Sequence, residues 1–177
     1  MPSYVVLLRG VNVGPNLRVP MAALRAGLEG LGAREVRTVL NSGNAVCASA
    51  TRSADRFSEQ VAALLQSQFG VTTPVIVKTA AEFSAIVSER PFPIAESDHS
   101  RVLVAFTRDL ESLQALRPIE ALVRPGEQFA LTERAAYLHC AGGLLESAAG
   151  EALLGRKPKP VTTRNWGTVC KIAALLS

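Results

Sequence analysis

Residues 36–48 have the sequence VRTVLNSGNAVCA, in which two apolar segments flank a polar turn. The segments 36–40 and 45–48 are rich in β-branched and apolar side chains, which is typical of strands. The intervening Asn-Ser-Gly-Asn is a strong hairpin-turn signal. The stretch therefore predicts a β-hairpin. Because a hairpin reverses the chain, it also determines at which end of a sheet the neighbouring loops lie.

The segments around the hairpin complete the order βαββαβ. Residues 4–8 form a continuous apolar run, which predicts a buried central strand. Apolar residues at helical spacing predict a helix over 20–31, and a second helix lies between an N-cap at Ser53 and Gly70. Residues 73–77 supply a fourth strand. This order is that of the ferredoxin-like split βαβ unit, so the predicted fold class is α+β.

The second half of the chain predicts a smaller α+β part. The expected domains are residues 1–90, the ferredoxin-like part, and residues 100–177, a βαββα part with a C-terminal helix, joined by a proline-containing linker. The chain shows no internal sequence repeat. The expected elements of the second part are strands at 101–107, 128–131 and 135–140, helices at 110–116 and 147–155, a basic connector at 156–160, and a last helix from about Arg164.

Composition excludes several protein classes. The chain has 177 residues, 48 % hydrophobic side chains and a net charge of +4, which excludes an intrinsically disordered protein. Its three cysteines are widely spaced and none forms a CxxC motif, so we predict neither a disulfide framework nor a metal site, and no cofactor. No apolar run approaches the roughly 18 residues of a membrane helix. A cytoplasmic protein without a membrane partner is expected.

Charge is unevenly distributed along the chain. Residues 1–44 contain five arginines and two glutamates, for a formal charge of +3, and residues 155–177 carry +5 with no acid. Residues 45–154 carry −4. If the two ends of the chain meet, they form a positive region suited to an anionic partner. The alternative is that the terminal basic side chains are simply solvated.

The loop after the first strand is the first candidate site. It contains Arg9, Gly10, Asn12 and Arg18, and it exceeds the two to six residues that are usual between a strand and a helix. Such a loop before a helix N-terminus can hold a phosphate or a carboxylate. It matches neither the Walker loop nor GxGxxG. The alternative is a long loop whose asparagines cap its own turns.

Two further segments carry candidate ligands. Asn41, Ser42 and Asn44 in the hairpin turn offer groups for a sugar or a base edge, and the topology predicts that they lie beside the first loop. A plain hairpin turn is the alternative. Arg164 and Asn165 lie at the predicted start of the last helix, where a capped N-terminus can bind an anion. His99 and His139 are weak signals, and His139 is predicted as a partly exposed strand residue.

These segments match a family. The shared motifs, in chain order, are LLRGVNVG at 7–14, PM and LR at 20–25, NSGN at 41–44, YLH at 137–139, TTRNW at 162–166, and Lys171. The chain resembles the bacterial family called domain of unknown function sixteen ninety-seven, from Tyr4 to Lys171. The resemblance implies a cytosolic protein with two small α+β parts. It implies no established activity, so no catalytic residue is carried over.

The chain departs from the family pattern at two places. Pro15 and Asn16 stand where the family usually has a glycine that is often followed by lysine. Ser147 and Ala148 stand where the family usually has Ser-Lys. Both changes remove a typical flexible or cationic feature.

The sequence therefore predicts an anion-binding protein. The expected ligand is a nucleotide or a nucleic-acid phosphate at the basic loop end of the N-terminal sheet, bound by Arg9, the loop and turn asparagines, and Arg164. Two alternatives remain. One is a small enzyme acting on a phosphorylated metabolite, and the other is a protein-interaction module whose basic ends bind an acidic protein. Substrate identity and oligomeric state are open.

Overall fold

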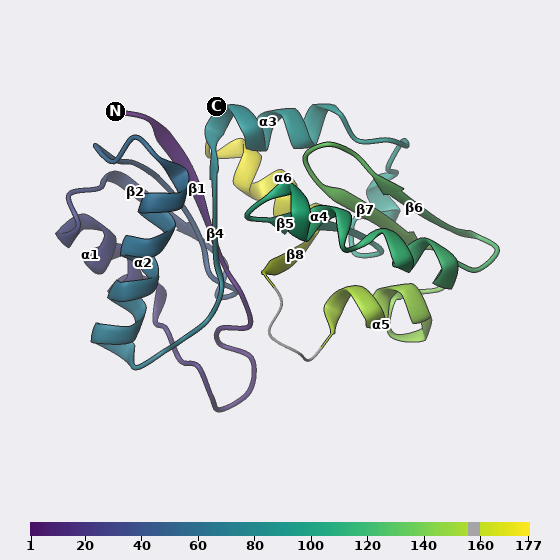
Figure 1. The fold of residues 1–177 in the computed structure, drawn as a ribbon, viewed down its shortest axis with the longest axis horizontal. Helices are drawn as coiled ribbons and strands as arrows, with labels where there is room; N and C mark the ends of the chain where they lie inside the picture. The colour runs from purple at the N-terminus through teal and green to yellow at the C-terminus, as the bar shows by residue number, and fades with distance from the viewer. Residues whose placement is uncertain (156–159) are drawn as a thin grey trace. The chain divides into compact units, whose positions relative to one another are not determined.

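The described residues form two units of mixed α and β structure. The computed structural model describes residues 1–155 and 160–177 (Figure 1). Within them, the chain divides into one unit of Met1–Ser84 with Lys171–Ser177 and a second of Ala85–Cys170. Each unit contains a four-stranded antiparallel sheet, which confirms the α+β class. The domain limits 1–90 and 100–177 stay a prediction.

The first unit follows the predicted order of elements. Its elements are β1 (Ser3–Leu8), α1 (Met21–Gly30), β2 (Arg34–Val39), β3 (Asn44–Ala48), α2 (Ala54–Phe69) and β4 (Val75–Thr79). The strands are arranged β2-β3-β1-β4, and every neighbouring pair is antiparallel. The predicted caps of α2 are confirmed, because Ser53 accepts a hydrogen bond from the Arg56 N–H and Gly70 adopts a left-handed φ of 63°.

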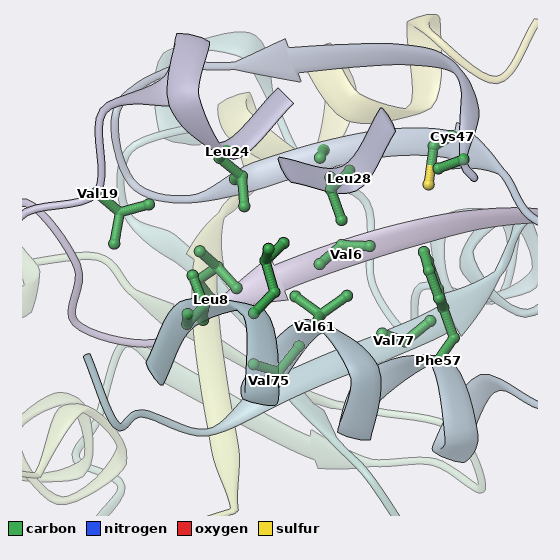
Figure 2. Packing of buried hydrophobic residues seen from close by; sticks show 14 of the residues in the cluster. Val6, Leu8, Val19, Leu24, Leu28, Cys47, Phe57, Val61, Val75 and Val77 are labelled. Atoms are coloured by element: carbon green, nitrogen blue, oxygen red, sulfur yellow. The ribbon is translucent and has the colours of Figure 1, made fainter. Parts of the chain in front are cut away.

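One face of this sheet packs against α1 and α2. Figure 2 shows Leu24 and Leu28 of α1, with Phe57 and Val61 of α2, directed toward Val6 of β1. All five side chains are at most 1 % exposed. Burying a large aliphatic or aromatic side chain contributes about 1.5–3 kcal/mol, so this cluster stabilises the unit and holds the ends of its strands in register. The loops at those ends are therefore carried on a rigid frame.

The second unit has its own helices and sheet. Its elements are η1 (Glu96–Asp98), β5 (Val102–Thr107), α4 (Leu110–Gln114), η2 (Arg117–Leu122), β6 (Glu127–Leu131), β7 (Ala136–Cys140), η3 (Leu144–Glu146), α5 (Ala148–Leu154) and β8 (Val161–Asn165). Its strands are arranged β6-β7-β5-β8. Two more helices, α3 (Ala80–Ser88) and α6 (Trp166–Ala174), follow β4 and β8 directly.

Strand β8 corrects the sequence prediction for the second part. We expected a βαββα part with a final helix from about Arg164, but Val161–Asn165 is a strand that pairs with β5, and α6 begins at Trp166. The two threonines and Val161 are β-branched, and such residues favour strands over helices. The predicted basic connector at 156–160 falls largely outside the described residues.

The described residues lack a membrane-spanning helix and a metal-binding cluster. In the part of the chain that the structure describes, no helix has the length and apolarity needed to cross a bilayer. Residues 1–155 and 160–177 also contain no group of three His, Cys, Asp or Glu side chains that could hold a metal ion.

Candidate functional site

The loop after β1 and the hairpin turn lie at the same end of the first sheet. The side-chain amide of Asn12 donates a hydrogen bond to the Asn41 carbonyl at 2.7 Å, and the Leu8 N–H donates to the Gly43 carbonyl at 2.8 Å. The register of β1 and β3 places Leu7 opposite Asn44. This confirms the convergence that the hairpin topology predicted.

Gly43 permits the close approach between turn and loop. It has a left-handed φ of 86°, and a Cβ atom at this position would lie 2.7 Å from the Leu8 Cβ and 2.8 Å from the Val11 Cγ2. Real Cβ atoms do not come that close to neighbouring carbons. Glycine is therefore required both by the backbone conformation and by the packing of the turn on Leu8 and Val11.

Asn12 holds the loop in its folded shape. Its side-chain amide donates to the carbonyls of Val19, at 2.8 Å, and Asn41, and its Oδ1 accepts the Val19 N–H at 2.9 Å. Its own N–H donates to the Leu17 carbonyl at 3.0 Å. Asn12 has a φ of 58°, which asparagine tolerates better than most residues. The Asn12 side chain therefore positions the loop, as one of the sequence alternatives proposed.

The turn asparagine Asn44 has a similar local role. It is 1 % exposed, and its amide donates to the Val39 carbonyl at 2.8 Å and to the Ser42 Oγ at 2.9 Å. A side chain this deeply buried does not present its amide to a ligand in solution. Asn41 and Ser42 are exposed, so the outward groups of the turn come from these two residues.

The cationic groups of the loop differ in their exposure. Arg18 is exposed, whereas Arg9 is half-buried, and this burial lowers the pKa of the Arg9 guanidinium. The Arg9 backbone is bonded to the start of β4, because its N–H donates to the Pro74 carbonyl at 3.2 Å. Gly10 is exposed with a φ of 64°. The loop thus carries one exposed cation and one half-buried cation close to the sheet.

The helix that follows the loop begins without a side-chain cap. Pro20 occupies the N-cap of α1, and within the described residues no side chain accepts a hydrogen bond there; the first turn contains no acid. The other five α-helices of the described chain do have a cap. The capping acceptors are Ser53 for α2, Thr79 for α3, Asp109 for α4, Ser147 for α5 and Asn165 for α6. The N–H groups of the first turn of α1 therefore have no side-chain acceptor among the described residues, and the positive end of the helix dipole has no carboxylate in its first turn.

Arg164 and Asn165 belong to the second unit and have local partners there. Arg164 is 7 % exposed, and its Nη1 donates to the Thr162 Oγ1 at 2.7 Å and to the Thr163 carbonyl at 2.8 Å. Burial lowers the Arg164 pKa to about 10. The Asn165 Oδ1 accepts the Thr168 N–H at 2.9 Å and so caps α6. Their participation in a site with the first-unit loop stays a prediction.

A pair in the second unit escaped the sequence analysis. The Nε2 of His139 on β7 lies 3.5 Å from the Asp98 Oδ2 on η1, and the ring of Phe92 lies 6.1 Å from the His139 ring. No local pattern could have found the pair, because the partners are far apart in the chain and are joined only by the fold.

Comparisons with known proteins place the chain in a family. The family described as protein of unknown function (DUF1697) matches residues 1–137. The chain belongs to this family. None of the curated proteins matches it. Among solved structures, the DUF1697 chain is similar to the conserved bacterial protein SP0830 from Streptococcus pneumoniae, with a TM-score of 0.81 and 24 % sequence identity over 99 % of each chain. At this identity the similarity establishes the fold alone.

Proposed function

We propose that this DUF1697 chain binds an anionic ligand at the loop end of its first unit, and that the ligand presents the phosphate of a nucleotide or a nucleic acid. The observation that carries the proposal is the uncapped N-terminus of α1 behind a basic loop. Unsatisfied N–H groups and the positive end of the helix dipole favour a phosphate at such a position. Arg18, two residues before the N-cap, supplies a cation.

The charge of the surrounding segments supports the same ligand class. No Asp or Glu occurs between Met1 and Glu29, or between Glu35 and Asp55. The loop, the start of α1 and the hairpin turn all fall within these acid-free stretches. An incoming anion therefore meets cations and N–H donors without a nearby carboxylate from the same segments.

The arrangement of strands supports a ferredoxin-like first unit. The order β2-β3-β1-β4 with antiparallel pairing is the one that a split βαβ unit produces. Sheets of this kind bind RNA through exposed aromatic side chains on their strands. In this sheet Val5, Leu7 and Ile76 are at most 1 % exposed, so the proposal uses the loop end rather than the sheet face.

The three cysteines are unbridged, which supports a cytoplasmic site of action.

The test is a thermal-shift and calorimetric titration with inorganic phosphate, ATP and a short single-stranded oligonucleotide, each at low and moderate salt. A ligand that binds the folded state raises Tm. Arg18→Gln removes the exposed cation, and Pro20→Asp supplies α1 with its own carboxylate cap. Each variant is expected to weaken binding by about tenfold or more, the equivalent of 1.4 kcal/mol.

The control is Arg52→Gln. Arg52 is also exposed, but it lies beyond the end of β3, at the opposite end of the sheet from the hairpin turn. Arg52→Gln therefore removes the same charge as Arg18→Gln, but from the opposite end of the sheet. Equal weakening by both substitutions would mean that only net charge matters. Unchanged binding in Arg18→Gln and Pro20→Asp would refute the proposed site.

A further inference from the structure

The loop and turn of the first unit expose three large aliphatic side chains. Val13 is 72 % exposed, Leu17 is 39 % exposed and Leu40 is 48 % exposed. Single exposed apolar residues are common on protein surfaces and require no explanation. These three differ because they belong to segments that are bonded together.

Asn12 links the backbone segments that carry the three side chains. Val13 follows Asn12 in the chain. The Asn12 N–H donates to the Leu17 carbonyl at 3.0 Å, and the Asn12 side-chain amide donates to the carbonyl of Asn41, the residue next to Leu40. Val13 is therefore the chain neighbour of Asn12, and Leu17 is its hydrogen-bond partner. Leu40 is the chain neighbour of its second partner, Asn41. We call Val13, Leu17 and Leu40 the apolar tip.

The backbone holds two members of the apolar tip in an unfavourable conformation. Leu17 has a φ of 53° and Leu40 a φ of 57°. Bulky side chains rarely adopt the left-handed region, where glycine and asparagine are the usual residues. Both leucines adopt this conformation, although neither side chain is buried in return.

We propose that the apolar tip is a docking surface for an acidic polypeptide segment that carries apolar side chains. Arg18 lies in the same loop, and the acid-free stretches around it make the surface complementary to a negatively charged partner. Interfaces combine an apolar centre with arginine in this way. This goes beyond the proposed phosphate site, because the contact is made by the apolar tip and not by the N-terminus of α1.

The side-chain chemistry favours a polypeptide over a nucleic-acid strand. Single-stranded nucleic acids bind through aromatic platforms on which the bases stack. The apolar tip is aliphatic, and aromatic residues make up only 5 % of the chain. Leucine and valine are instead suited to packing against the apolar face of an amphipathic segment.

The test measures the fluorescence anisotropy of a labelled acidic peptide with leucines at helical spacing, added to the full chain. Two control peptides replace the leucines by serine or the acids by their amides. The triple variant Val13→Ser, Leu17→Asn, Leu40→Asn removes the apolar tip, and asparagine tolerates the left-handed backbone at positions 17 and 40. We expect the acidic leucine peptide to bind, and the triple variant to bind it about tenfold or more weakly.

The matched control is the double variant Leu122→Asn, Leu154→Asn. These leucines of the second unit are 42 % and 46 % exposed, close to Leu17 and Leu40, so the control removes two comparably exposed leucines elsewhere, and it should bind like the wild type. The proposal is overturned if the acidic leucine peptide does not bind, if the serine peptide binds equally well, or if the triple variant binds like the wild type. Binding of a single-stranded oligonucleotide through the apolar tip, or self-association lost in the triple variant, would also overturn it.

The two proposals fail in different ways. Pro20→Asp acts at α1 and leaves all three residues of the apolar tip in place. If it abolishes the response to phosphate while peptide binding persists, both proposals stand. If phosphate has no effect on Tm and the peptide still requires the apolar tip, only the phosphate site is refuted.

Discussion

The two units share a strand arrangement but connect it differently. In both, the first strand has six residues and lies between the third and fourth strands, and the fourth strand runs directly into a nine-residue helix. The connection from the first strand to its helix spans residues 9–20 in the first unit and only residues 108–109 in the second. Two residues are therefore enough to make this turn.

The difference shows that the long loop is not required by the topology. In the second unit, the short connection ends in Asp109, whose carboxylate caps α4 by accepting the Ser112 N–H at 2.7 Å. In the first unit the corresponding helix start is uncapped, and the additional residues contain two arginines and two exposed apolar side chains. Loops in excess of what a fold needs are where binding residues concentrate.

Gly43→Ala should have the largest effect on stability, because it disrupts the packing of the hairpin turn on the loop after β1. The new Cβ would lie 2.7 Å from the Leu8 Cβ, in a backbone conformation that disfavours alanine. Overpacking of this kind typically costs about 1–3 kcal/mol, and the left-handed φ of 86° adds about 1 kcal/mol. The free energy of unfolding, measured in urea, should fall by the sum of these two costs.

Gly32→Ala is the matched control. Gly32 has the same φ of 86°, and no described atom lies within 4 Å of the position that its Cβ would occupy. Gly32→Ala should lower the free energy of unfolding only by the conformational cost of the left-handed φ, about 1 kcal/mol. If the two substitutions destabilise the chain equally, the contact of Gly43 with Leu8 and Val11 contributes nothing to stability.

Asn12→Gly should have the next largest effect. Glycine keeps the φ of 58° accessible, so the loss isolates the three side-chain hydrogen bonds to Val19 and Asn41. At roughly 0.5–1.5 kcal/mol for each bond, we expect a loss of about 1–3 kcal/mol. Amide hydrogen exchange should accelerate at Val19 and remain unchanged in β6 and β7. Unchanged exchange at Val19 would show that the loop is ordered without this side chain.

The sequence was sufficient to place the loop and turn together. The hairpin signal, the buried first strand and the helix between them determine which ends of the strands meet, and the Asn12–Asn41 bond lies where this reasoning predicted. The continuous apolar run located β1, and helical spacing and cap residues located the two helices that cover it. Long-range placement followed from topology because each strand reversal was signalled locally.

The sequence was not sufficient to assign side-chain roles. Whether Asn12 binds a ligand or the loop depends on backbone conformations such as the left-handed φ of Leu17, which no local propensity predicts. The burial of Arg164 follows from its place in β8, a strand where the sequence predicts the start of the last helix. His139 and Asp98 pair only through the fold.

The shared topology of the two units was also missed, for a geometric reason. The first connection differs by ten residues between the units, and α2 has 16 residues where α5 has seven. A repeat search detects similar residues at a constant period, and these differences remove any period. The two sheets share the order in which their strands pair, and this order cannot be deduced from the spacing of residues along the chain.

Alkaline pH should destabilise the protein through one buried ionisable group in each sheet, in two different pH ranges. Burial raises the pKa of Cys47 on β3 from 9.0 to about 11, and burial raises the pKa of Tyr137 on β7 from 10.0 to about 12. In each case the unfolded chain releases its proton first. The stability from Cys47 is complete below pH 9 and is lost as pH rises through 11. The window for Tyr137 runs from pH 10 to 12.

Urea unfolding at a series of pH values measures this loss. One pKa shift of this size corresponds to about 1–3 kcal/mol. Cys47→Ala should flatten the decline between pH 9 and 11, and Tyr137→Phe should flatten the decline between pH 10 and 12. The control Cys170→Ala removes a half-buried thiol and should flatten the curve less. A slope between pH 9 and 10 that is the same in Cys47→Ala and the wild type would contradict the assignment.

Exchanging the helix caps should change stability least and test function most directly. Asp109→Ala removes the cap of α4 and should cost about 1 kcal/mol. Pro20→Asp gives α1 the cap that α4 has, and the gain of about 0.5–2 kcal/mol is largely offset by the lost rigidity of proline, about 0.4–1 kcal/mol. Its Tm should therefore stay close to that of the wild type. The new carboxylate would occupy the N–H groups that we assign to the ligand, so phosphate should no longer raise Tm. If Pro20→Asp folds normally and still responds to phosphate, the uncapped start of α1 is a structural feature without a binding role, and the long loop must serve another purpose.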